Sequence, residues 1–166
     1  MRIKQEVLLG IGAVRVLKKL EIDVSAYHMN EGHAAFSGIE RIIQLMTEKK
    51  MSFLEAKSAI INSTVFTTHT PVPAGNDYFT PERLEKFIKP VIENSDVKMP
   101  VILSLGRKNQ SDDKEYFCMT VLALRLSSRS NAVSVLHVAR NLAGRSHEPY
   151  TDTLRHERYS YKNMDI

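Results

Sequence analysis

One stretch of this chain constrains its fold more than any other. Residues 64–79 read TVFTTHTPVPAGNDYF, in which a β-branched and aromatic run leads into a histidine and then into Pro71, Pro73 and Gly75. The run favours a short buried strand over residues 64–70, and the prolines and the glycine prevent its continuation. The sequence therefore predicts His69 at the end of a strand. Ligands bind beyond this end of the strands in a parallel sheet, so the stretch is a candidate binding site.

Helical and strand patterns alternate around this stretch. Apolar residues between positions 3 and 20 recur at i, i+3 and i+4, which predicts an amphipathic helix. Ser52 and Glu55 form the capping box of another helix, and Thr80 followed by Pro81 is a typical helix start. The expected elements are helix 3–20, strand 22–29, helix 34–49, a helix after Ser52, strand 64–70, helix 81–89, a loop over 94–115, helix 119–126, and a short strand or turn over 131–137. This alternation predicts an α/β fold, with a parallel sheet flanked by helices.

Composition narrows the class of protein. The 166 residues are 43% hydrophobic, which suffices for the core of one domain. No apolar run approaches the roughly 20 residues that cross a bilayer, so we expect a soluble cytoplasmic protein without a membrane partner. The net charge of +4 is spread along the chain, which argues against a nucleic-acid partner. The single cysteine, Cys118, excludes an internal disulfide and is expected to be a buried, inert thiol.

Two glycines near the N-terminus suggest a nucleotide-binding loop at first sight. Gly10 and Gly12 lie within a helical pattern, however, with no strand before them and no third glycine at the required spacing. Close packing of helices is the better interpretation of these glycines.

The polar residues near the two predicted strand ends leave several kinds of site open. His28, His33 and His69 could bind a metal together with Glu31, because adjacent loops of a parallel sheet meet above its edge. They could instead line a hydrogen-bonding cleft or serve as structural histidines. Glu31 and His69 could also act as an acid–base pair, for which the distance between them would have to be known. The residues alone do not decide between these sites.

Two motifs together resemble one enzyme family. YHMNEGHAAF at residues 27–36 and STVFTTHTPVPAGNDYF at residues 63–79 are similar to motifs of the alpha-glucan phosphorylases, the glycogen and maltodextrin phosphorylase family. The helical segment that opens the chain and residues 119–137 resemble the family as well. The resemblance extends over about residues 2–137 and is weakest between residues 89 and 116.

The resemblance implies a fold and an activity. Members have two Rossmann-like domains in a glycosyltransferase B-type fold, and they cleave terminal α-1,4-glucosidic bonds of glycogen or maltodextrin with inorganic phosphate to give glucose 1-phosphate. It implies that His69 lies against the glucosyl unit and that Asn30, Glu31 and His33 line the same cleft. His28 precedes this loop and is expected to face the sheet. The family coenzyme, pyridoxal 5′-phosphate, is held by a lysine of the C-terminal domain.

The chain also departs from the family. Nothing in it resembles the segment with the coenzyme lysine, so no cofactor is expected to bind this chain alone, and no metal is expected either. We expect residues 1–138 to be a partial N-terminal domain and residues 139–166 to be a divergent, poorly ordered tail, as from a truncated or frame-shifted gene. The chain would then be an inactive piece of a phosphorylase, whose remainder could be encoded separately. The alternative is a glucan-binding module or a subunit of a split enzyme without catalysis of its own.

Overall fold

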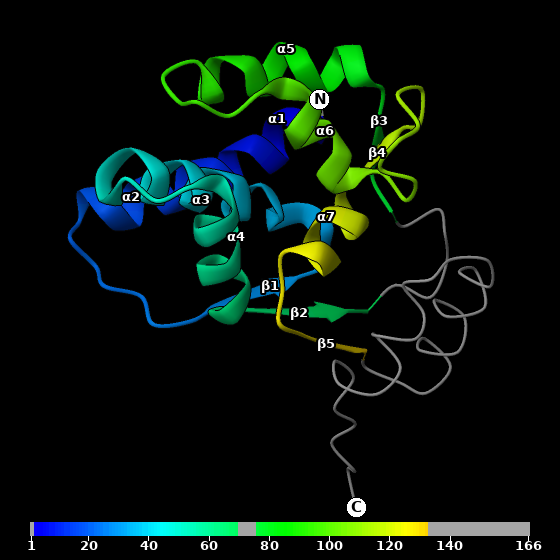
Figure 1. Cartoon of the computed structure of the whole chain (residues 1–166). Coiled ribbons are helices and arrows are strands. Elements are labelled where there is room, and N and C mark those ends of the chain that lie inside the picture. Colours follow the sequence, from blue (N-terminus) through cyan, green and yellow to red (C-terminus); the bar gives the residue numbers. More distant parts are fainter. Residues whose placement is uncertain (1, 70–75, 133–166) are drawn as a thin grey trace, which may run out of the picture.

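The computed structural model describes residues 2–69 and 76–132 of the chain, and Figure 1 shows the arrangement of their helices and strands. The elements in chain order are α1 (Arg2–Val7), η1 (Leu8–Gly12), α2 (Ala13–Lys19), β1 (Tyr27–Asn30), η2 (Gly32–Ala34), α3 (Phe36–Lys49), α4 (Phe53–Asn62), β2 (Thr64–Thr68), β3 (Tyr78–Phe79), α5 (Pro81–Ile92), α6 (Met99–Gly106), β4 (Phe117–Cys118), α7 (Met119–Arg125) and β5 (Arg129–Ala132).

A parallel sheet forms the base of the molecule. Its strand order is β1-β2-β5, with both pairs parallel, and the described helices lie on one side of it (Figure 1). The register aligns Met29 of β1 with Phe66 of β2 and Phe66 with Ser130 of β5, and all three side chains are buried under the helices. The predicted α/β fold with a parallel sheet and flanking helices is therefore confirmed, and it is consistent with a part of a Rossmann-like domain.

The predicted N-terminal helix is continuous from α1 through η1 to α2, with η1 as a π-helical segment in its middle. Gly10 lies in this segment, and a Cβ atom there would come within 2.8 Å of the Cβ of Phe36 and of the backbone nitrogen of Ser37. The glycine thus allows η1 to approach α3 closely. The packing interpretation of Gly10 is confirmed.

The first strand begins later than predicted. β1 starts at Tyr27 because its partner in the register is Thr64, where β2 itself begins, so the residues before Tyr27 have no neighbouring strand. β2 ends at Thr68, and His69 follows directly. The predicted capping box is present, since Ser52 accepts from the backbone of Glu55 and the Glu55 carboxylate accepts from the Ser52 N–H.

Two predictions in the second half were wrong at proline and glycine residues. α5 does not end before Pro90 but continues to Ile92, because Leu84, Ile88 and Ile92 lie one turn apart on its buried face and their packing outweighs the interruption.

The expected loop over residues 94–115 contains helix α6. Pro100 lies in its first turn, where the missing N–H has no helical partner to lose. Gly106 ends the helix beneath Phe117, whose ring atoms would lie 2.4 Å from an added Cβ. The glycine therefore marks close packing rather than a loop.

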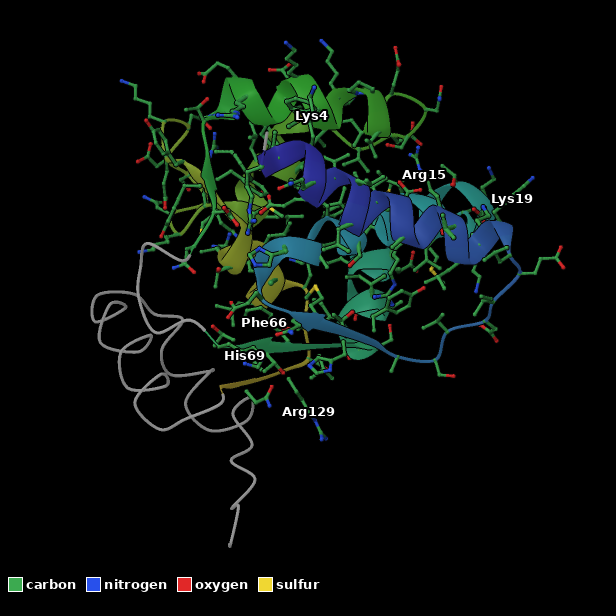
Figure 2. The ribbon with its side chains drawn as sticks, turned by 180° about the vertical axis from the view of Figure 1, so that it is seen from behind. Lys4, Arg15, Lys19, Phe66, His69 and Arg129 are labelled. Carbon is green, nitrogen blue, oxygen red and sulfur yellow. The ribbon has the colours of Figure 1, made fainter. Side chains whose placement is uncertain are left out.

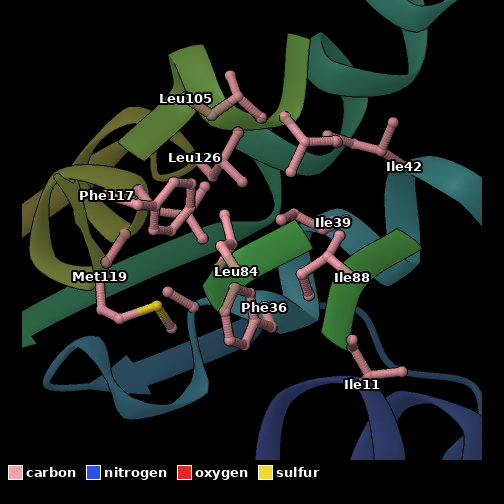
Figure 3. Packing of buried hydrophobic residues seen from close by; sticks show 14 of the residues in the cluster. Ile11, Phe36, Ile39, Ile42, Leu84, Ile88, Leu105, Phe117, Met119 and Leu126 are labelled. Atoms are coloured by element: carbon pink, nitrogen blue, oxygen red, sulfur yellow. The ribbon is translucent and has the colours of Figure 1, made fainter. Parts of the chain in front are cut away.

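The core lies between the helices and the sheet, and Figure 3 shows part of it. Phe36 of α3 and Phe117 of β4 stack with ring centroids 6.2 Å apart, and aliphatic side chains from α5, α6 and α7 surround them. Cys118 is buried beside this core as a free thiol, as predicted. In the part of the chain that the structure describes, no helix has the length and apolar character needed to cross a membrane.

Candidate functional site

The two sequence motifs meet at one edge of the sheet. Asn30 is the last residue of β1 and lies opposite Thr67 of β2, so Glu31 and His69 follow neighbouring strands at their carboxyl ends. His69 is exposed there, at the end of β2 in Figure 2. The prediction of His69 at a strand end is confirmed. The proline loop that follows, residues 70–75, and the tail predicted over 139–166 lie outside the described residues.

Glu31 has an unusual backbone conformation. Its φ of 60° and ψ of 178° fall in a region that only glycine adopts freely, and a non-glycine residue pays about 1–3 kcal/mol to remain there. Gly32 follows, and its Cα packs so closely on α7 that an added Cβ would lie 3.0 Å from the carbonyl carbon of Met119. The turn after β1 thus joins a strained glutamate to a glycine that packs tightly on α7. Such strain is concentrated at functional sites, which supports a site at Glu31.

The Glu31 carboxylate is directed at the end of the neighbouring strand. It accepts a hydrogen bond of 2.5 Å from the backbone N–H of His69 and one of 3.4 Å from the hydroxyl of Thr68. The backbone N–H of Glu31 in turn donates to the carbonyl of Thr67 at 2.9 Å. Glu31 thereby fixes the point where the chain leaves β2 and enters the proline loop.

His33 lies at the other end of that loop. Its Nδ1 is 2.8 Å from Arg2 Nη2 and 3.3 Å from Asp77 Oδ2, and Asp77 follows the proline loop. Arg2 also donates to both carboxylate oxygens of Asp77 over 3.0–3.1 Å. Glu31 and His33 of the first motif therefore contact the two ends of the loop in the second motif.

Glu6 completes a group of charged side chains that we call the Arg2 cluster: Arg2, Glu6, His33 and Asp77. Glu6 Oε1 is 3.5 Å from Arg2 Nε and 3.8 Å from His33 Nδ1, and the Glu6 side chain is 2% exposed. No described group donates a hydrogen bond to either of its carboxylate oxygens. Burial, followed by the hydrogen bond and charge of Asp77, raises the pKa of Glu6 to about 9.

The pKa of Asp77 is shifted in the opposite direction. Burial acts to raise its pKa, but the hydrogen bonds from Glu6 and Arg2 and the Arg2 charge outweigh burial and lower the pKa of Asp77 below its ordinary value. At neutral pH, Glu6 is thus the protonated carboxyl group of the pair and Asp77 the ionised one.

The structure gives His28 and His33, two of the histidines that could have shared a metal, different neighbours. His28 lies on the open face of the sheet, where Nε2 is 2.7 Å from the hydroxyl of Thr67, whereas His33 belongs to the Arg2 cluster. Glu6, His33 and Asp77 do offer ligand-type atoms within 4.8 Å of one another. The guanidinium of Arg2 lies among them, however, and supplies the positive charge, so we assign these groups to an ion-pair cluster.

The open face of the sheet is polar around Asn30. Asn30 lies beside Thr67, and the Thr67 hydroxyl donates to Asn131 Oδ1 at 2.5 Å across β5. Asn30 is exposed, and Arg129 extends away from the helices on the same side (Figure 2). Asn30 therefore reaches the sheet edge beside Glu31, but from the face opposite the core.

The sequence-based prediction missed Arg2, Glu6 and Asp77. Asp77 stands within the motif that carries His69, so its place near the site could have been expected. Arg2 and Glu6 are four residues apart on α1, which is a common surface pair on helices, and nothing local shows that Glu6 is buried. Only the folded chain brings α1 against the loop ends.

The arrangement has the chemistry of a site for a neutral polar ligand. An amide, a carboxylate and imidazoles at a sheet edge can exchange short hydrogen bonds with hydroxyl groups. Losing one such bond would leave a partly buried polar group without a partner, which is how such sites discriminate between ligands.

Comparisons with known proteins point to the same family as the motifs. No protein-family model matches the chain. It is 46% identical over 136 residues to a maltodextrin phosphorylase of Thermococcus litoralis and 42% identical over 147 residues to a glycogen phosphorylase of Mycobacterium tuberculosis. A glycogen phosphorylase of Aquifex aeolicus is 34% identical over 140 residues. Each match covers 82% of this chain but only 15–20% of the relative, so the chain spans a small part of the length of these enzymes.

Proposed function

We propose, because the chain is homologous to one segment of the glycogen and maltodextrin phosphorylases, that it forms one wall of the glucan-binding cleft of such an enzyme. The whole enzyme would cleave terminal α-1,4-glucosidic bonds with inorganic phosphate and release glucose 1-phosphate. Its partners would be an α-1,4-glucan or maltodextrin, phosphate and the remainder of the enzyme, and we place it in the cytoplasm.

The meeting of the two motifs at one sheet edge carries this proposal. The Glu31 carboxylate holds the N–H of His69, and His33 contacts Asp77 at the far end of the same loop. The strained backbone at Glu31 adds support, because such strain is concentrated at functional sites.

Each site residue has a proposed role toward the sugar. The exposed imidazole of His69 donates to a hydroxyl of the terminal glucosyl unit. Glu31 accepts hydrogen bonds from neighbouring hydroxyls, and Asn30 can both accept and donate. The exposed edge of the His33 ring makes hydrogen bonds of the same kind. These roles bind and orient the glucan. They do not by themselves break the glucosidic bond.

The described residues do not fit a site for pyridoxal 5′-phosphate. A lysine that holds this coenzyme as a Schiff base needs a desolvated pocket, whereas every described lysine is exposed or half-buried on a helix or loop. When bound, the coenzyme would supply a phosphate group for proton transfer. We therefore assign it to another part of the enzyme and expect the isolated chain to release no glucose 1-phosphate from maltodextrin and phosphate, even with added coenzyme.

Calorimetric titration with maltoheptaose tests the proposed binding. We expect weak binding that His69→Ala reduces at least about fivefold, the equivalent of one lost hydrogen bond of about 1 kcal/mol. His28→Ala is the matched control, because this histidine is exposed on the sheet face against Thr67 and should leave the affinity unchanged. An absence of heat at millimolar ligand, or equal effects of the two substitutions, would remove the support for a glucan cleft.

A further inference from the structure

The Arg2 cluster holds a feature that sugar binding does not explain. Glu6 is almost fully buried, yet no described group makes a hydrogen bond to its carboxylate oxygens, and a second carboxylate, that of Asp77, lies beside it. An ionised Glu6 would be a buried charge beside a like charge, with one guanidinium at 3.5 Å as compensation. Such a charge is costly to bury. A protonated Glu6 can instead donate a hydrogen bond to Asp77.

Arg2 is hydrogen-bonded to Asp77 and not to Glu6. Its Nε and Nη2 atoms donate to the Asp77 carboxylate at 3.0–3.1 Å, and these bonds have the bidentate form that Arg and carboxylate prefer. Arg2 Nη2 also lies 2.8 Å from Nδ1 of His33. Nη2 is also 3.3 Å from Nε2 of the same ring, and Nδ1 is 3.3 Å from Asp77 Oδ2. The position of the imidazole thus depends on Arg2 and Asp77 together.

We infer that Glu6 and Asp77 share one proton, and that this proton holds the Arg2 cluster together and so positions His33 at the sheet edge. Glu6 is then a positioning residue that acts through Asp77 and Arg2. The opposite shifts of the two carboxyl pKa values agree with a single proton on Glu6.

Among the described residues, three ionisable groups interact with Glu6. They are Arg2 on its own helix, His33 on η2 and Asp77 ahead of β3. Helix α5 also packs against α1, and it adds no ionisable group to the interactions of Glu6 that the structure describes. Above the pH at which Glu6 loses its proton, one buried and one partly buried negative charge face one arginine. Arg2 then turns toward Glu6, and His33 loses its contact with the Arg2 guanidinium.

Nuclear magnetic resonance on the whole chain tests the inference without any ligand. The side-chain carboxyl carbon of Glu6 should titrate near pH 9, and the ring nitrogens of His33 should show a step with the same midpoint. In Glu6→Gln, which mimics the protonated acid, the His33 step should vanish. The control Glu85→Gln, on the outer face of α5 against Lys89, should retain it. A Glu6 midpoint near its ordinary 4.5, or a His33 step that survives in Glu6→Gln, would overturn the inference.

A second variant tests the shared proton separately. Asp77→Asn removes the like charge and leaves only a neutral amide oxygen as acceptor, so the Glu6 midpoint should fall by at least about one pH unit. An unchanged midpoint would show that burial alone holds the proton and would refute the sharing.

The effect of the Glu6 titration on glucan binding rests on the proposed function. If His33 contacts glucan, maltoheptaose affinity of the wild type should fall about fivefold as the pH rises through the Glu6 titration, and Glu6→Gln should keep its affinity. A protein that binds no glucan at any pH would refute the proposed function, while the ring titration would still decide the inference.

Discussion

Replacing Glu6 by glutamine should remove a pH dependence of stability that the wild-type chain carries. Glu6 has an ordinary pKa of 4.5, raised in the folded chain to about 9. A raised pKa means that the folded state keeps a proton that the unfolded state has lost. The resulting stabilisation is complete below pH 4.5 and disappears as the pH rises toward 9.

The magnitude follows from linkage. Each unit of pH between the two pKa values costs about 1.4 kcal/mol of unfolding free energy, so the wild type should lose up to about 3 kcal/mol between about pH 6 and pH 8. Glutamine has no proton to release, and Glu6→Gln should lack this loss. Asp77 does not interfere, because its lowered pKa adds stability that is lost only in acid, below its ordinary 3.8.

Urea unfolding followed by circular dichroism at several pH values measures this difference. The curves of wild type and Glu6→Gln should diverge as the pH rises, with the variant the more stable at alkaline pH. Glu85→Gln, which changes an exposed glutamate paired with Lys89, should follow the wild type. Parallel curves for wild type and Glu6→Gln would show that Glu6 is ionised in the folded chain, and the reasoning about its burial would fail.

Substitutions at three further positions test other parts of the structure by urea unfolding. At position 31, Glu31→Gly should be about 1–2 kcal/mol more stable than Glu31→Ala, because both lose the carboxylate but only glycine adopts the positive φ without strain; equal stabilities would contradict the strained turn. Gly10→Ala should cost about 1–3 kcal/mol, since its Cβ would come within 2.8 Å of Phe36, and a neutral result would argue against the close approach of η1 and α3. Ser52→Ala should cost about 1 kcal/mol by removing the cap of α4, and no change would mean that the capping box with Glu55 contributes nothing.

Local patterns in the sequence predicted the parts of the fold that local forces decide. The amphipathic N-terminal helix, the Ser52 cap and the position of His69 after a β-branched run all follow from the spacing of neighbouring residues. Pro90 and Gly106 misled the prediction because their cost is local, while the packing that outweighs it comes from residues far along the chain.

The candidate site could be predicted only in part for the same reason. Asn30, Glu31, His33 and His69 stand in recognisable motifs, but the partners of His33 do not. Arg2 and Asp77 are separated by 75 positions, and only the docking of α1 against the loop ends joins them. The strained backbone of Glu31 is likewise invisible in the sequence, since nothing marks a glutamate for a positive φ.

Mapping maltoheptaose binding by backbone amide chemical shifts tests the central claim most directly. If the two motifs form one wall of a glucan cleft, addition of the sugar should shift the amides of Glu31, His33, His69 and Asp77 together, with one common dissociation constant. Amides of α5 on the far side of the core should stay unchanged. Shifts scattered over the surface, or none at the sheet edge at millimolar sugar, would contradict the account.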